Sequence, residues 1–470
     1  MVKKEEGFQL LSYLIPIASY VPKIKESEKT VPLKDKLIWT LLALFIFLVS
    51  SQIPLFGIIK QSDEDPFLWS RIIMASNRGS LMELGINPIV SAGMVIQVLT
   101  GAKLISTDNN NPSDKKLIEI LQKLIAIIIA LFESITYVFS GIYGEPETLG
   151  VTRIFLIVIQ LMFAAIIVIL LDEALTSGYG IVSGISLFIA TNVCEELLWK
   201  SFSPLKNNDE YEGVIIAFFQ TLFKEKSLIK ALRYSFFRDS FSNLTGLLST
   251  IIVFMIVNFF QGFQINLAIH NQTLRGHNEA YPIKLFYTSN MPVILQSTLL
   301  SNFFFISKLL YSKFKNWSII RYLGSWSDIN GQSIPISGLA YLLHAPNSLS
   351  VLLNNPFKAV FYILFMLISC AVFSRTWIEF SGNGPKEVYK SLKNQKISAY
   401  GGSERLLEKR LNKYIPIAAT VGGACIGVLS LLADFLGAIG SGTGILLTCG
   451  IVFEFYETYT KEVKSGQSVF

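Results

Sequence analysis

The sequence predicts an all-α membrane protein with ten transmembrane helices in two halves of five. Hydrophobic residues make up 51% of the 470-residue chain and charged residues only 16%. Several uninterrupted apolar runs approach 20 residues, the length that crosses a bilayer as a helix. The runs fall into two groups of five, which would place the N-termini of the two halves on opposite sides of the membrane. An inverted repeat requires that arrangement.

The N-terminal part, residues 1–32, includes Phe8–Val21, where helical spacing of apolar residues predicts a helix on the membrane surface. Lysines precede the first span, so the positive-inside rule places the N-terminus in the cytosol. The first half, residues 33–203, contains five predicted spans: Leu37–Ile53, Leu84–Leu104, Leu117–Tyr143, Arg153–Leu171 and Ile185–Trp199. Phe56–Ser80 is too polar to span and half apolar, which indicates either a surface loop or a segment that folds back into the protein.

A polar connection, residues 204–243, joins the halves on the side opposite the termini and contains a short apolar helix, Val214–Phe223. The second half, residues 244–460, contains five more predicted spans: Leu244–Phe260, Ile283–Leu310, Phe357–Phe380, Tyr414–Leu432 and Ile439–Tyr459. Residues 461–470 form a tail. Ten spans place both termini in the cytosol, together with loops 263–284 and 381–413.

Two predicted spans are unusually polar. Phe286–Ser301 contains Asn290, Pro292 and Gln296, and Leu84–Lys103 contains several side chains of the same kind, namely Asn87, Ser91 and Gln97. Lipid offers side-chain amides no hydrogen-bond partners, so these helices should face protein or a water-filled path. The pair therefore predicts a pathway between them, although buried bundle helices with satisfied polar groups would give the same pattern.

The loop Ser381–Lys413 is densely basic, with eight lysines and arginines against three acids. Cytosolic topology alone produces some excess of positive charge. A cluster this long also favours an anionic partner, for which lipid headgroups and ribosomal RNA are candidates.

Signs of an enzyme or of a metal site are missing from the sequence. The three histidines, His270, His277 and His344, are predicted to lie in loops without HExxH spacing, and no GxSxG or Walker motif occurs. The four cysteines fall in or beside apolar runs without paired spacing, so they are expected to pack as small hydrophobic residues. No cofactor or metal is predicted, and the start of the chain lacks the pattern of a cleavable signal peptide.

Six stretches in chain order resemble the alpha subunit of the eukaryotic Sec translocon, the endoplasmic-reticulum branch of the SecY family. They are Gln52–Ile58, Asp65–Gly93, Val182–Asn192, Tyr281–Ser297, Ser374–Gly382 and Asp434–Leu447. The resemblance runs from the N-terminal helix to the tenth span, which is nearly the whole chain. The resemblance implies two five-span halves around a central hourglass pore. It further implies a pore-forming subunit that moves nascent secretory chains across the endoplasmic-reticulum membrane and inserts membrane proteins through a lateral gate.

The resemblance also assigns roles to residues. The pore constriction would be a ring of aliphatic side chains: Ile86, Val90, Ile185, Ile189, Ile294 and Leu447. A plug at about 61–78 would contribute Phe67, Leu68, Trp69, Ile72, Ile73 and Met74. Aliphatic side chains can close on one another yet offer ions no replacement for their hydration.

The two polar spans resemble the lateral gate, whose matching positions are Ser91, Glu133 and Asn302. Relatives usually have glutamine where this chain has Glu133. A hydrogen bond from Asn302 to Glu133 is the expected arrangement, because the amide can donate to either protonation state. A neutral acid, hydration from the pore and a solvated position near the helix end are the alternatives.

The cytosolic loops resemble the family's ribosome-docking loops, with Arg275, Arg405, Lys409 and Arg410 as the expected contacts. Relatives commonly have an arginine just before a glutamate, whereas this chain has Ser403 before Glu404. Implied partners are small beta and gamma subunits, the ribosome, nascent chains with their signal sequences, membrane lipids and post-translational accessory factors. A secondary transporter of a small solute is the competing prediction, and it would require converging charges at the membrane midplane.

Overall fold

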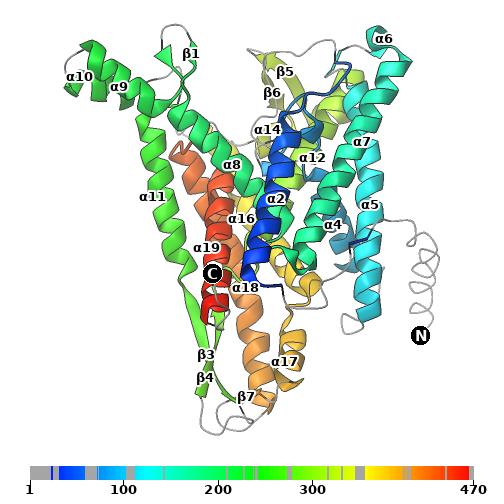
Figure 1. Cartoon of the computed structure of the whole chain (residues 1–470), viewed down its shortest axis with the longest axis vertical. Helices are drawn as coiled ribbons and strands as arrows, with labels where there is room; N and C mark the ends of the chain where they lie inside the picture. The colour runs from blue at the N-terminus through cyan, green and yellow to red at the C-terminus, as the bar shows by residue number, and fades with distance from the viewer. Residues whose placement is uncertain are drawn as a thin grey trace.

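The computed structural model describes residues 23–24, 31–58, 71, 73–101, 112–140, 143–144, 146–207, 210–225, 228–236, 238, 242–271, 278–314, 317–329, 332–344, 355–394, 397–399, 404–439 and 442–464. The chain is mostly helical, with long helices running side by side along the molecule (Figure 1). The predicted surface helix Phe8–Val21 lies outside the described residues.

The first half forms helices close to the predicted spans. Its elements are α2 (Leu33–Gln52), η1 (Leu81–Glu83), α4 (Asn87–Gly101), α5 (Pro112–Phe139), α6 (Pro146–Leu149), α7 (Val151–Ala174), η2 (Leu175–Tyr179) and α8 (Gly184–Phe202). Large apolar side chains of α2 and α7 face outward: Ile38, Leu41, Phe45, Phe155 and Phe163 are each at least 55% exposed. An apolar exterior of this kind suits a helix that contacts lipid.

The connection between halves forms β1 (Lys206–Asn207), β2 (Glu210–Tyr211), α9 (Val214–Glu225) and α10 (Leu228–Phe236). The second half contains α11 (Leu244–Gln261), α12 (Met291–Lys313), α13 (Ser318–Leu323), α14 (Leu339–Leu343), α16 (Pro356–Ser381), α17 (Pro385–Asn394), α18 (Glu404–Phe435) and α19 (Gly442–Lys464). Six helical segments of the described part are long and apolar enough to span a membrane: Leu81–Thr100, Val151–Tyr179, Leu244–Gln261, Met291–Lys313, Pro356–Asn394 and Leu406–Phe435.

The fold is mostly helical, as the sequence predicts, but it also contains short strands. In the described part of the chain they form three small antiparallel sheets: β1 with β2, β3 (Gln264–Asn271) with β4 (Asn278–Lys284) and β7 (Ile397–Ala399), and β5 (Ser325–Ile329) with β6 (Gln332–Ser337). The loop predicted over 263–284 is therefore largely a hairpin, and His270 lies in a strand. The alternation of Ile265, Leu267 and Ile269 with polar residues carries this signal.

The largest differences from the predicted boundaries are at the starts of two helices. Ile283 belongs to β4, and α12 begins only at Met291, with Pro292 in its first turn, where the missing N–H costs nothing. The other shift concerns α18, which starts at Glu404 rather than Tyr414, so the last part of the basic loop is helical.

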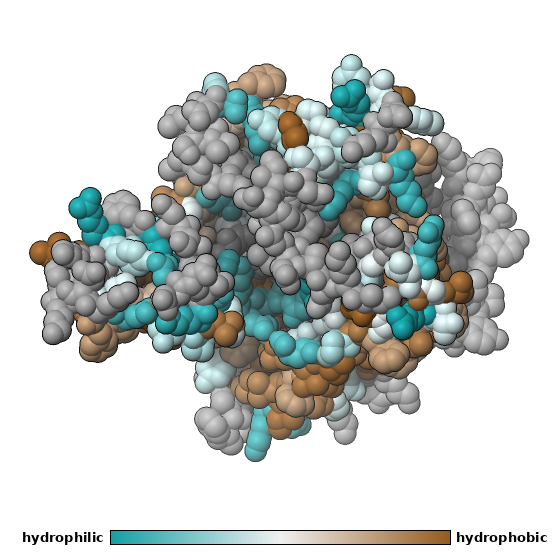
Figure 2. All heavy atoms as spheres, turned by 90° about the horizontal axis from the view of Figure 1, so that it is seen from above, coloured by the Kyte–Doolittle hydropathy of each residue, from teal (hydrophilic) through white to brown (hydrophobic). Residues whose placement is uncertain are grey.

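The extramembranous elements lie at two opposite ends of the molecule (Figure 1). One end carries α6, α9, α10, β5 and β6, and the other carries α17 and the sheet of β3, β4 and β7. Seen from the first end, apolar side chains form a patch along one edge while polar side chains lie nearer the centre (Figure 2). The long helices between these ends enclose the main hydrophobic core.

Candidate pore and lateral gate

All six side chains of the predicted ring meet in one hydrophobic cluster. Ile86 lies just before α4, and Val90 lies in its first turn. The others are Ile185 and Ile189 of α8, Ile294 of α12 and Leu447 of α19. Five of them are at most 3% exposed, and Ile185 is partly buried against the same cluster. The structure thus brings together aliphatic residues that are up to 361 positions apart in the chain (447 minus 86).

Close contact between α12 and α19 holds part of this cluster in place. The Asn290 side-chain amide donates to the Leu447 backbone carbonyl over 3.1 Å. Gly450 makes the approach possible, because a Cβ at this position would lie 2.0 Å from Asn290 Nδ2. Asn290, at the start of α12, therefore fixes the position of Leu447 along the helix axes relative to Ile294.

The described part of the predicted plug packs on the same cluster. Ile73 and Met74 are buried among the ring residues, and the Ile86 N–H donates to the Met74 carbonyl over 2.9 Å. Thr298 of α12 lies with its hydroxyl 3.6 Å from the Met74 sulfur. The other predicted plug residues, Phe67, Leu68, Trp69 and Ile72, lie outside the described residues.

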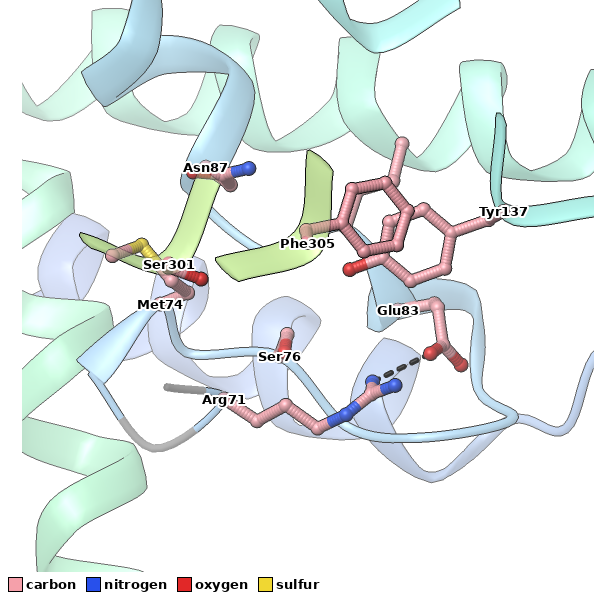
Figure 3. A pocket seen from close by; sticks show the side chains of 9 residues that line it. Arg71, Met74, Ser76, Glu83, Asn87, Tyr137, Ser301 and Phe305 are labelled. Carbon is pink, nitrogen blue, oxygen red and sulfur yellow. Dashed lines mark ion pairs between the residues drawn. The ribbon is translucent and has the colours of Figure 1, made fainter. Parts of the chain in front are cut away.

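A buried ion pair fixes the chain next to the plug residues (Figure 3). Arg71 Nη1 lies 2.5 Å from Glu83 Oε1, and both side chains are at most 8% exposed. The Gly79 N–H donates to the other Glu83 oxygen, and Asn192 of α8 donates to the Arg71 carbonyl over 3.3 Å. Removing one partner of such a pair leaves a buried charge, which typically costs about 3–5 kcal/mol.

This ion pair borders a cavity of about 20 Å³, roughly enough for one water molecule. Asn87 of α4, Tyr137 of α5 and Phe305 of α12 point toward it (Figure 3). The Tyr137 and Phe305 rings stack with centroids 4.8 Å apart, which joins α5 to α12. Neither residue spacing nor polarity in the sequence marks this aromatic pair or the ion pair.

The three predicted gate residues belong to one hydrogen-bonded cluster whose centre is Asn87. Asn87 Nδ2 lies 2.7 Å from Glu133 Oε1 and 3.1 Å from Asn302 Oδ1. The Asn302 amide donates to Ser91 Oγ over 2.9 Å, and the Ser91 hydroxyl lies 3.3 Å from Asn87 Oδ1. The cluster joins α4 and α5 of the first half to α12 of the second half.

The expected hydrogen bond from Asn302 to Glu133 is therefore replaced by bonds through Asn87. The Asn87 amide can donate to two oxygens at once, because it carries two N–H groups. Glu133 Oε2 is buried and has no hydrogen-bond partner among the described residues. A second polar contact between the halves joins Gln97 of α4 to Thr376 of α16 over 2.6 Å.

Two of the predicted docking residues, Lys409 and Arg410, are exposed on the first turns of α18. Leu407, Leu411 and Ile415 bury the opposite face against β3, β4 and α17. Arg275 lies outside the described residues, and for Arg405 the structure describes the backbone alone. Within the described part of the chain, no group of three or more histidine, cysteine or acidic residues could hold a metal ion.

The sequence matches two known family models. A family model described as SecY matches residues 80–456. The chain belongs to the SecY family. A second model, described as the plug domain of Sec61p, matches residues 45–79 of this SecY-family chain and so includes the expected plug.

Individual relatives support the same assignment along the whole chain. The SecY-family member is 49% identical over 462 residues to the Sec61 subunit alpha of Dictyostelium discoideum, a protein transport protein, covering 97% of each. Its structure resembles a solved protein-conducting channel with a TM-score of 0.80 and 31% identity, over 97% of this chain and 98% of that one. Sec61 in the canine ribosome-channel complex from the endoplasmic reticulum matches with a TM-score of 0.78, 30% identity and the same coverage.

Proposed function

We propose that this chain is the pore-forming subunit of a protein-conducting channel in the endoplasmic-reticulum membrane. It passes nascent secretory polypeptides across the membrane and releases hydrophobic segments into lipid. The observation that carries the proposal is that six aliphatic side chains, from the start of α4 and the residue before it, α8, α12 and α19, belong to one buried cluster together with Ile73 and Met74 of the expected plug. Such a ring adapts to any passing side chain, yet it offers ions no ligands. No step of this function requires catalysis.

Ten spans and a central hourglass pore are part of the proposal. Six helical segments meet length and hydropathy criteria for a span. Four further helices, α2, α5, α8 and α19, contain 20, 28, 19 and 23 residues and lie alongside them. Each is long enough to cross about 30 Å of hydrocarbon, given a rise of 1.5 Å per residue.

Two matching sets of hydrogen bonds support an inverted repeat of residues 33–203 and 244–460. Thr40 of α2 accepts from the Ile181 N–H over 3.3 Å, and Thr250 of α11 accepts from the Ile439 N–H over 2.9 Å. α2 and α11 are the first helices of the two halves. Ile181 and Ile439 lie just before the fifth helix of each half, so the two contacts are equivalent.

A second equivalent pair lies between the fourth and fifth helices of each half. Asp172 Oδ1 accepts from the Ile185 N–H over 3.0 Å, and Asp434 Oδ1 accepts from the Gly442 N–H over 2.8 Å. Each carboxylate meets the first turn of the next helix, where the helix dipole stabilises negative charge. Asp434 therefore has a structural role as the partner of the first turn of α19.

The orientation proposed here places both termini, α17 and the sheet of β3, β4 and β7 in the cytosol, and residues 204–243 in the lumen. It rests on the basic residues of 381–413 and of the N-terminal flank. Arg275, Arg405, Lys409 and Arg410 then face a ribosome. Further partners are small beta and gamma subunits, signal sequences, lipids and post-translational accessory factors.

The lateral gate is proposed to open between α4 and α12, where the Asn87 cluster joins the halves. A hydrophobic signal sequence would bind the separated helices in place of this polar contact, and so shift the equilibrium toward the open state. A secondary transporter of a small solute is disfavoured, since the ring at the centre of the described helices is aliphatic rather than charged.

Reconstitution tests the proposed function. The purified chain, with its small subunits, is incorporated into vesicles and programmed with ribosomes that synthesise a secretory reporter. We expect the reporter to become protected from external protease only in vesicles that contain the channel. Equal protection in empty vesicles, or none in either, would contradict the proposal.

A further inference from the structure

A cavity of roughly 170 Å³ adjoins the pore ring at Ile294. Residues from the start of α8, the start of α12, the end of α16 and the middle of α19 line it. The end of α16 leads directly into α17, so the cavity lies toward the end of the molecule that carries the basic elements (Figure 1). In the proposed orientation, a polypeptide reaches this cavity from the cytosol before it meets the ring.

Among the described residues that line the cavity, most are polar and one is charged. Hydroxyl and amide groups come from Ser186, Thr288, Ser381 and Asn383, among others, while Glu454 of α19 supplies the charge. Glu454 is exposed, so its carboxylate is accessible from the cavity. Hydroxyl and amide oxygens beside a carboxylate provide the acceptors that an ammonium or guanidinium group needs.

Among the described residues, the charges around Glu454 sum to a negative value. Lys284 of β4 forms an ion pair with Glu457, one turn after Glu454 on the same helix. Its ammonium group also lies 5.7 Å from the centre of the Phe453 ring. Lys284 therefore neutralises Glu457, and this group of three charged residues has a net charge of −1 that Glu454 contributes on the cavity side.

We propose that this cavity binds a lysine or arginine side chain of the polypeptide entering the channel, with Glu454 as the anionic partner. The inference rests on the proposed function and names a feature of the substrate. A hydrophobic segment preceded by lysines would bind with its basic flank at Glu454, and its apolar part would continue to the ring and gate. Glu454 thereby favours the orientation that keeps the basic flank in the cytosol.

Two single-span reporters test the proposal in the complete channel. One has three lysines before its hydrophobic segment and the other has three glutamines, and glycosylation at either end reports orientation. In the unsubstituted channel the lysine flank should increase the fraction with a cytosolic N-terminus. Glu454→Gln should reduce this lysine preference by about 1.5- to fivefold, the range expected from a partly exposed ion pair. Glu454→Asp should retain most of it.

Glu119→Gln is the matched control, because Glu119 is an exposed acid near the same end of the molecule on α5 and does not line the cavity. It should leave the lysine preference unchanged. Ser381→Lys, which places a cation in the cavity without touching Glu454, should reduce the preference as Glu454→Gln does. Normal insertion with an unchanged lysine preference in both cavity variants would overturn the proposal. Failure of both reporters to insert in the unsubstituted channel would instead contradict the proposed function.

Discussion

Asn87 connects three helices through one short side chain. Its amide reaches Glu133 on α5 and Asn302 on α12, and its carbonyl oxygen faces Ser91 one turn along α4. The sequence indicates that these polar residues should find partners inside the protein. It does not predict which of them meet, because that depends on the rotation of each helix about its axis, which side-chain packing determines.

Replacing Glu133 with leucine should weaken the closed gate, because Glu133 holds the Asn87 amide in the position from which it also donates to Asn302 across the gate. One such bond contributes about 0.5–1.5 kcal/mol, so the open fraction should rise about two- to twelvefold. Less hydrophobic signal sequences should then engage the channel, and Asn87→Leu should have at least as large an effect. Translocation of a reporter series with graded signal hydrophobicity measures the threshold.

Phe132→Leu is the control for the gate variants, since Phe132 precedes Glu133 but is 70% exposed on the outside of α5. Its hydrophobicity threshold should match that of the unsubstituted chain. If Glu133→Leu also left the threshold in place at normal protein levels, the acid would have no part in gating.

Gly85 occupies a position that no other residue fits. Its φ is +55°, and a Cβ there would lie 2.2 Å from the Met74 carbonyl oxygen and 2.8 Å from that of Ala75. Gly85→Ala should therefore displace the plug segment from the ring and lower the unfolding temperature of the purified protein. Gly437→Ala is the control, because Gly437 has a φ of +65° but no atom within 4 Å of the added Cβ. Equal unfolding temperatures for the two variants would argue against a specific contact at Gly85.

The first ten residues of helix α18 were predicted as loop rather than helix. Its charged first turns lower the mean hydropathy, so the predicted span starts at Tyr414. Leu407, Leu411 and Ile415 nevertheless follow the four-residue spacing of a helix, and all three are buried. The basic residues thus lie on the first turns of a helix whose segment Leu406–Phe435 is long and apolar enough to span a membrane.

Reversing the charge of Arg405, Lys409 and Arg410 to glutamate should weaken ribosome binding and reduce its salt dependence. Fewer counterions are released on binding for each phosphate contact that is lost. The magnitude of the slope of log K against log salt therefore falls by about 0.7–0.9 per contact. Binding of purified channels to ribosomes at several salt concentrations measures both quantities. Arg321→Glu, at an exposed position on α13, should change neither. An unaltered affinity and slope in the triple variant would remove this helix from the interface.

The apolar runs predict most of the long helices, and the resemblance supplies the proposed ring residues, which lie in one buried cluster. The apolar alternation of β3 was present in the sequence but was overlooked, whereas the shorter hairpins of β1–β2 and β5–β6 have weak patterns. The proposed inverted repeat leaves no visible sequence identity, since only a few positions such as Thr40 and Thr250 need to be equivalent for the two halves to pack alike.

The ring should seal the idle channel by hydrophobic contact. Replacing Ile86 and Ile294 together with serine removes two buried apolar side chains, each worth about 1.5–3 kcal/mol when fully buried. The constriction should become hydrated, and ion conductance of the purified channel in planar bilayers should increase. Ile306→Ser, on the exposed face of α12, is the control and should leave conductance low. Unchanged conductance in the double variant would show that the ring is not the seal, or that the plug alone is sufficient.

We expect translocating polypeptides to pass through the aliphatic ring that includes Ile294 of α12. Site-specific crosslinking tests this path, with a photoreactive amino acid at Ile294 of the channel and a secretory chain stalled on the ribosome during translocation. We predict adducts between the stalled hydrophilic part of the chain and Ile294, and none from the same probe at Ile306, which is 52% exposed on the outside of the same helix. Adducts at Ile306 without any at Ile294 would contradict a path through the ring.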